Sequence, residues 1–233
     1  MAIYALSDLH LSLSTDKPMD VFGDKWENYT QRIKENWQSI LSDEDLIIIP
    51  GDVSWATYLT DAYEDFKFIN NLPGRKVIIK GNHDYWWTTL KKMEEFLAEN
   101  QFNTIKILNN TAIGFENAAI CGTRGWSVQD NNDEDDERII DREKKRLILT
   151  LEEAVKLKKE KLIVGIHYPP FDRHGEENGF LEIMRSYGVD ICVYGHLHSY
   201  AHKNAVEGEL NGVELRLVAG DFVDFCPVKI LGT

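Results

Sequence analysis

The sequence predicts an α/β fold. Short apolar runs rich in β-branched residues, which are typical of buried strands, alternate with stretches whose apolar residues recur at helical spacing. The 233 residues are 43% hydrophobic and 28% charged, an ordinary globular composition for a chain long enough to bury a large core. No internal repeat and no linker rich in Pro, Gly or Ser interrupts the pattern. We therefore expect residues 1–233 to form a single domain.

Nine apolar runs are the predicted strands. They are Ile3–Leu6, Leu46–Ile49, Val77–Ile79, Ile105–Leu108, Ala118–Cys121, Leu162–Ile166, Ile191–Tyr194, Val213–Val218 and Val228–Leu231. The runs after residue 100 lie closer together than those before it, which indicates a second sheet or an antiparallel portion.

Helical spacing places sets of apolar residues on common faces between these strands. The sets are Ile33, Trp37, Ile40 and Leu41; Leu59, Tyr63 and Phe66; Leu90, Met93 and Leu97. A further helix is expected near Glu143–Lys159, with Leu147, Leu151, Ala154 and Val155 facing inward. The acidic run Asp130–Glu137 lacks the Gly and the ligand spacing of a calcium-binding loop, so we expect a solvated surface loop there.

Charge and cysteine content limit the class of protein. The net charge of −13 argues against binding to long nucleic acid, which requires a basic surface, but it permits a phosphorylated substrate where bound cations reverse the local charge. The three cysteines are far apart and indicate buried thiols in a reducing compartment. No apolar run reaches the ~18 residues of a membrane span, and polar Ser7 follows too soon for a signal peptide. These observations predict a cytoplasmic protein without a membrane partner.

Polar side chains follow five of the predicted strands. The segments are Ser7-Asp8-Leu9-His10, Pro50-Gly51-Asp52, Lys80-Gly81-Asn82-His83-Asp84, His167 and Gly195-His196-Leu197-His198. The carboxyl ends of strands are where α/β sheets place ligands, so we expect these Asp, Asn and His side chains to meet at one edge of the fold.

Each fragment alone also has an ordinary structural interpretation. Gly51-Asp52 would suit a turn, His167 a buried core histidine, and Asn82-His83-Asp84 a helix cap. Their conjunction favours a metal site, because burying so many polar groups together without a cation would be costly. Nitrogen and oxygen donors of this mixture suit Mn, Fe or Zn.

The ordered series of motifs resembles the calcineurin-like metallophosphoesterases, and the match extends from residue 8 to residue 198. This resemblance implies a four-layer α/β/β/α sandwich of two mixed sheets flanked by helices, with two metal ions at the carboxyl ends of the strands. It implies that one metal is held by Asp8, His10, Asp52 and His198, and the other by Asn82, His167, His196 and the shared Asp52. A carboxylate has two oxygens, so Asp52 is suited to bridge two cations.

The resemblance also implies that His83 is the catalytic imidazole, acting as a general acid or stabilising the transition state. Many relatives carry a second acid three residues after the bridging Asp, followed by Arg, where this chain has Trp55 and Ala56. The missing Arg argues against a protein serine/threonine phosphatase. The missing acid leaves open what orients His83, for which the adjacent Asp84 is one candidate.

Two further residues are candidates for substrate binding. Arg124 follows a predicted strand and suits a phosphate fork, although an exposed Arg in a turn would look the same. His174 lies in the polar loop after His167, which would hang over the site, whereas His202 is expected at the surface.

The sequence thus predicts a metal-dependent phosphoesterase that hydrolyses a small phosphomonoester or phosphodiester through a metal-bound hydroxide. The alternatives are a nuclease or cyclic-nucleotide phosphodiesterase on the same fold, and a non-catalytic scaffold with a phosphoesterase-like fold. The scaffold is disfavoured because all seven ligand positions and His83 are present.

Overall fold

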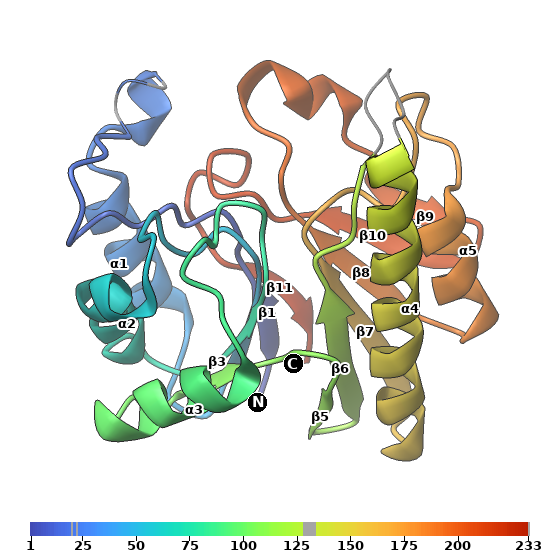
Figure 1. Cartoon of the computed structure of the whole chain (residues 1–233), viewed down its shortest axis with the longest axis horizontal. Helices are drawn as coiled ribbons and strands as arrows, with labels where there is room; N and C mark the ends of the chain where they lie inside the picture. The colour runs from blue at the N-terminus through green and yellow to red at the C-terminus, as the bar shows by residue number, and fades with distance from the viewer. Residues whose placement is uncertain (20, 22, 128–133, 233) are drawn as a thin grey trace.

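Two β-sheets stack face to face in the computed structural model, with helices on their outer faces (Figure 1). The structure describes residues 1–19, 21, 23–127 and 134–232. Helices α1, α2 and α3 cover one sheet, and α4 and α5 cover the other (Figure 1). The predicted α/β fold of two mixed sheets flanked by helices is confirmed.

The first sheet has the strand order β11-β1-β2-β3-β4. Its strands are β1 (Ile3–Ala5), β2 (Leu46–Pro50), β3 (Arg75–Ile79), β4 (Ile105–Ile107) and β11 (Val228–Leu231). Strands β1 to β4 run parallel, whereas β11 pairs antiparallel with β1. The helices that connect the parallel strands are α1 (Tyr29–Ile40), α2 (Tyr63–Asn70) and α3 (Leu90–Glu99). Each presents its apolar stripe to the sheet, as the helical spacing predicts.

The second sheet has the order β5-β6-β7-β8-β10-β9. Its strands are β5 (Ala112–Phe115), β6 (Ala118–Thr123), β7 (Lys161–Ile166), β8 (Ile191–Tyr194), β9 (Gly208–Leu210) and β10 (Val213–Leu217). The four central strands are parallel, and each edge strand is antiparallel to its neighbour. Helices α4 (Glu134–Lys156) and α5 (Gly179–Ser186) pack on its outer face.

Three apolar clusters hold the layers together. One lies under α1–α3, one under α4 and α5, and the third between the two sheets. The middle cluster includes Ile48, Ile79, Ile163 and Val193, whose strands are buried on both faces. This explains why the parallel strands read as continuous apolar runs in the sequence. Short 3₁₀ turns occur at Asp24–Trp26, Leu59–Ala62 and Ser199–Asn204.

Every predicted strand is present, but three short elements escaped prediction. Strands β5 and β9 are edge strands of four and three residues, and α5 has only eight. Both strands contain a glycine and few β-branched residues, and α5 is little more than two turns long, so none of the three stands out as a periodic run. They form because a longer neighbour offers a partner.

The long helix α4 corrects two expectations. Residues 134–137 of the acidic run begin this helix rather than forming a loop, whereas residues 130–133 lie outside the described residues. Val155 was expected to face inward but is 52% exposed, because Leu147, Leu151 and Ala154 already fill the buried face. The helix ends at Lys156, shortly before Lys158 adopts a left-handed backbone with φ 51°.

Among the described residues, no helix combines the length and apolar character needed to cross a membrane. Cys121 and Cys192 are buried, Cys226 is half-buried, and all three are free thiols. The compartment and the number of domains stay predictions.

Candidate metal centre

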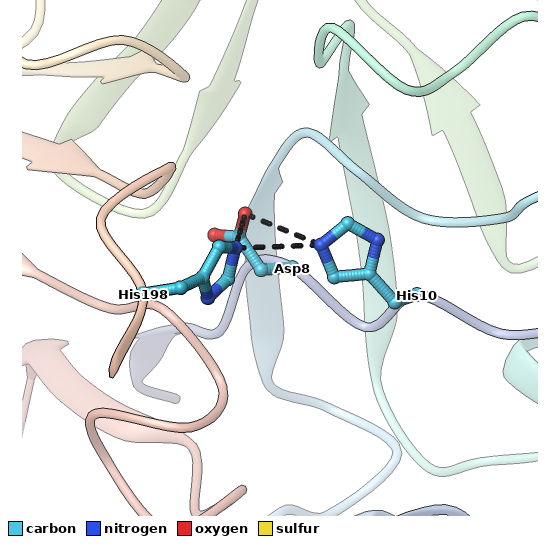
Figure 2. Close-up of side chains that lie close together, drawn as sticks. All are labelled: Asp8, His10 and His198. Atoms are coloured by element: carbon cyan, nitrogen blue, oxygen red, sulfur yellow. Dashed lines mark hydrogen bonds and ion pairs between the residues drawn. The ribbon is translucent and has the colours of Figure 1, made fainter. Parts of the chain in front are cut away.

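Asp8, His10 and His198 converge beyond the carboxyl ends of β1 and β8. The His198 Nε2 atom lies 3.1 Å from Asp8 Oδ1 and 3.4 Å from His10 Nε2. Figure 2 shows the two imidazoles pointing toward each other beside the Asp8 carboxylate. One ligand atom from each residue lies within 4.8 Å of the other two, an arrangement that could hold a cation.

A second group forms around Asp52, at the end of β2. Its Oδ2 atom lies 3.5 Å from His167 Nε2 and 3.7 Å from His10 Nε2, so Asp52 stands between the two sets of donors. The Asn82 Oδ1 atom lies 2.6 Å from His167 Nε2 and 3.0 Å from His196 Nδ1. The structure therefore brings together all seven side chains that the motifs suggest as metal ligands.

The backbone around these side chains is strained. Asp8, His10, Asp52 and His196 adopt positive φ angles of 56°, 43°, 52° and 71°. Non-glycine residues avoid this region, and strain of this kind collects at functional sites. Two glycines permit the close approach of the loops, because a Cβ atom at Gly81 would overlap Asp52, and one at Gly195 would overlap Asp8.

Burial keeps most of these imidazoles neutral. It lowers the pKa of His167 to about 3 and that of His196 to about 4, and it lowers the pKa of His10 well below its usual range. His198 differs: burial opposes its charge, but Asp8 and Asp221 raise its pKa to about 10. Burial and the charges of Asp8 and Asp84 raise the pKa of Asp52 well above its usual range.

This donor set fits metal ions. Neutral imidazoles and carboxylates are the ligating forms of His and Asp, and cations would offset the cost of crowding Asp8 and Asp52 in a buried space. Two groups of possible ligands overlap here: Asp8, His10 and His198 form one, and Asp8, Asp52 and His167 form the other, so Asp8 is common to both. The Asp52 Oδ2 atom lies within reach of both His10 and His167, which suits a site for two metal ions. These residues would hold two cations.

Outer residues fix the orientation of the imidazoles. The backbone oxygen of Pro50 lies 3.0 Å from His167 Nδ1, and Asp221 Oδ1 lies 2.8 Å from His198 Nδ1. Asp221 is buried, and its second oxygen accepts from the backbone N–H of Ser199 at 3.0 Å. The same oxygen lies 3.3 Å from His202, which is therefore tied to the site and is not the surface residue expected from the sequence. A carboxylate behind a ligating histidine is a recurrent feature of metal sites.

Asp221 was missed by the sequence analysis, although a signal existed. Gly220-Asp221 comes two residues after the predicted strand Val213–Val218, just as Gly51-Asp52 comes two residues after the predicted strand Leu46–Ile49. We predict that Asp221→Ala will weaken metal binding by about 10- to 100-fold, because His198 loses the group that fixes its ring. Calorimetric titration with Mn²⁺ measures this. Asp224→Ala, at an exposed position three residues away, is the control. Equal affinities for both variants would refute this role.

Asp84 does not orient His83. Its carboxylate is buried and accepts hydrogen bonds from the backbone N–H groups of Gly81 (2.7 Å), Asp52 (3.0 Å) and Val53 (2.9 Å), and from the indole of Trp86 (3.0 Å). It thus ties the loop after β3 to the loop after β2. The adjacency in sequence was misleading because the Asp84 carboxylate is taken up by donors from the two loops and from Trp86.

His83 is held by aromatic packing. Its ring lies 4.5 Å from the Trp55 ring, and Trp55 in turn stacks on His10 at 4.9 Å. The His83 Nδ1 atom lies 3.4 Å from the Tyr85 hydroxyl, and its backbone N–H donates to Asp52 Oδ1 at 2.8 Å. Trp55 therefore packs against the rings of both His83 and His10. The ring of His83 is half-buried at the rim of the centre.

The two predicted substrate residues lie apart from this cluster. The Arg124 side chain pairs with buried Glu143 at 3.5 Å and packs 4.7 Å from the Trp126 ring, so it is not the exposed turn residue of the alternative interpretation. His174 is exposed and lines a cavity of about 730 Å³ together with Leu197, the residue between two candidate ligands. Their roles in binding substrate stay predictions.

Comparison with known proteins agrees with this geometry. The family model of the calcineurin-like phosphoesterases matches residues 1–200, and the chain belongs to this family. A search of curated proteins gave no match.

Two solved structures share the fold. A protein of unknown function from Aquifex aeolicus, AQ665, is 19% identical with a TM-score of 0.51; the match covers 98% of this chain and 95% of that one. The protein TT1561 from Thermus thermophilus is 11% identical with a TM-score of 0.54, and the match covers 84% of this chain and 81% of the other. At these identities the likeness concerns the fold alone.

Proposed function

We propose that this protein is a dinuclear-metal phosphoesterase that hydrolyses a small phosphomonoester or phosphodiester. The observation that carries the proposal is a pair of buried carboxylates among imidazoles. Asp8 belongs to two groups of possible metal ligands, and Asp52 Oδ2 lies 3.7 Å from His10 Nε2 and 3.5 Å from His167 Nε2. Bound cations would neutralise the phosphoryl group and make water nucleophilic at neutral pH. Mn, Fe and Zn all suit the donors.

Other residues of the chain would orient the metal ligands and assist the leaving group. Asp221 and the Pro50 carbonyl fix the imidazoles of His198 and His167, so that the donors need little rearrangement. His83 stands at the rim and, when protonated, would donate a proton to the leaving oxygen or stabilise the charge that develops there. The packing of Trp55 on His83 limits the orientations of that ring.

The metal requirement and the ester class can be tested together. We expect about two metals per chain by mass spectrometry after purification or metal loading. Para-nitrophenyl phosphate and bis-para-nitrophenyl phosphate are the monoester and diester substrates. Chelation should abolish turnover and added metal should restore it. A folded protein that takes up no metal on loading, and that hydrolyses neither these esters nor a panel of phosphorylated metabolites and nucleotides, would refute the proposal and favour a scaffold.

A further inference from the structure

A second cavity lies beside the metal centre. It has a volume of about 370 Å³ and opens between the loop after β3, the end of β6 and helix α4. Its charged lining residues are Lys80, Arg124, Arg146 and Glu143. Three positively charged side chains and one carboxylate give the cavity a net charge of +2, whereas the net charge of the whole chain is −13. A polar cavity of this sign is suited to an anion.

The positively charged side chains of the cavity keep hydrogen-bond donors that have no partner among the described residues. Buried Glu143 holds Arg146 at 2.8 Å and Arg124 at 3.5 Å, and its second oxygen accepts from the Thr123 hydroxyl at 2.9 Å. The Arg124 Nε atom is buried and has no hydrogen-bond partner among the described residues. The Lys80 ammonium group makes no hydrogen bond or ion pair with the described part of the chain. A buried donor without a partner is costly, and an oxyanion would satisfy it.

The cavity is connected to the metal centre through the backbone. Lys80 comes two residues before Asn82 on the same loop. The Arg124 carbonyl accepts from the backbone N–H groups of His167 (3.1 Å) and Tyr168 (3.0 Å), and the Tyr168 ring lies 4.2 Å from the His196 ring. The segments that line the cavity therefore also hold residues of the candidate metal centre in place.

We propose that this cavity is an anion subsite, in which Lys80, Arg124 and Arg146 bind a second phosphoryl group of the substrate. The preferred substrates are then phosphoesters with two phosphoryl groups, one for the metals and one for the cavity. This inference rests on the proposed function for its catalytic part, whereas the binding of an oxyanion to the cavity does not depend on it. Thr88 and Asn109 also line the cavity and suit a hydroxylated spacer, beside apolar Ile79, Trp87 and Leu108.

The binding of inorganic phosphate to the cavity can be measured separately from catalysis. The Asp52→Asn variant is used for this titration, because it should bind anions only weakly at the metal centre. Calorimetry should show one phosphate per chain, and adding Lys80→Met should weaken it by about tenfold, the loss expected for one charged hydrogen bond. Lys106→Met, which alters an exposed side chain on β4, removes the same charge elsewhere and should change nothing. Circular dichroism confirms folding of each variant. The proposed subsite is refuted if Lys80→Met leaves the affinity for phosphate unchanged, or if no phosphate binds.

Catalysis is tested in the metal-loaded protein with fructose bisphosphate and fructose monophosphate. Lys80→Met should raise KM for the bisphosphate by about tenfold and leave KM for the monophosphate and both kcat values nearly unchanged. An equal effect on both esters would overturn the assignment to a second phosphoryl group, even if free phosphate binds. No turnover of any phosphoester would contradict the proposed function, while the phosphate titration would still decide the subsite.

Discussion

Asp52→Asn is expected to abolish activity and to empty the metal centre. The substitution keeps the shape of the side chain but removes its charge and places an amide NH₂ near imidazole nitrogens that lie 3.5 and 3.7 Å away. Loss of an outer partner of a metal ligand costs about 10- to 100-fold, so loss of the shared ligand should cost more than about 100-fold in kcat/KM. Mass spectrometry should find fewer metals per chain than in the wild type.

Asp43→Asn is the matched control, because Asp43 is exposed and precedes β2 at the opposite end of the strand from the site. It should retain metal and activity. Both variants should unfold cooperatively in a thermal scan, which separates loss of the centre from loss of the fold. Hydrolysis by Asp52→Asn at the wild-type rate would contradict the role of Asp52 and the proposed mechanism with it.

His83→Gln is expected to lower kcat by about 10²- to 10⁴-fold while the metals remain bound. The backbone N–H of His83, which donates to Asp52 at 2.8 Å, is kept in this variant, and the lost ring lies at the rim rather than between the donors. Metal content equal to the wild type is the internal control. Activity within a few-fold of wild type on every ester would exclude a catalytic role.

The leaving group distinguishes the two roles of His83. A nitrophenolate leaves without a proton, whereas an alkoxide needs one. If His83 is the general acid, His83→Gln will slow an alkyl phosphate far more than para-nitrophenyl phosphate. If it stabilises charge on the phosphoryl group, both substrates will slow by a similar factor.

The position of the site was predictable because it follows from sheet geometry. Strands β1, β2 and β3 are parallel neighbours in one sheet, and β7 and β8 in the other. Residues that follow such strands meet at one edge, whatever the detailed packing. Asp8, Asp52, Asn82, His167 and His196 could therefore be placed together from the order of the motifs. The apolar runs themselves identified the strands because both faces of each parallel strand are buried.

The partners of these side chains could not be predicted in this way. Asp84 is next to His83 in sequence but binds backbone N–H groups of two loops, and Trp55 rather than an acid packs against the His83 ring. Arg124 was expected to be either free for phosphate or exposed, yet helix α4 supplies Glu143 as its partner. Such pairings depend on contacts between layers, which no local pattern records.

The sequence by itself determined the α/β class, all strands but β5 and β9, the convergence of the seven candidate ligand positions and the family. The tertiary structure alone decided that Trp55 packs against His83, that Asp221 supports His198, and that three cations surround a cavity beside the centre. The physical reason is the range of the interactions. Periodicity and strand ends are local or follow from the sheet, whereas hydrogen bonds and charges depend on side chains brought within a few ångströms by folding.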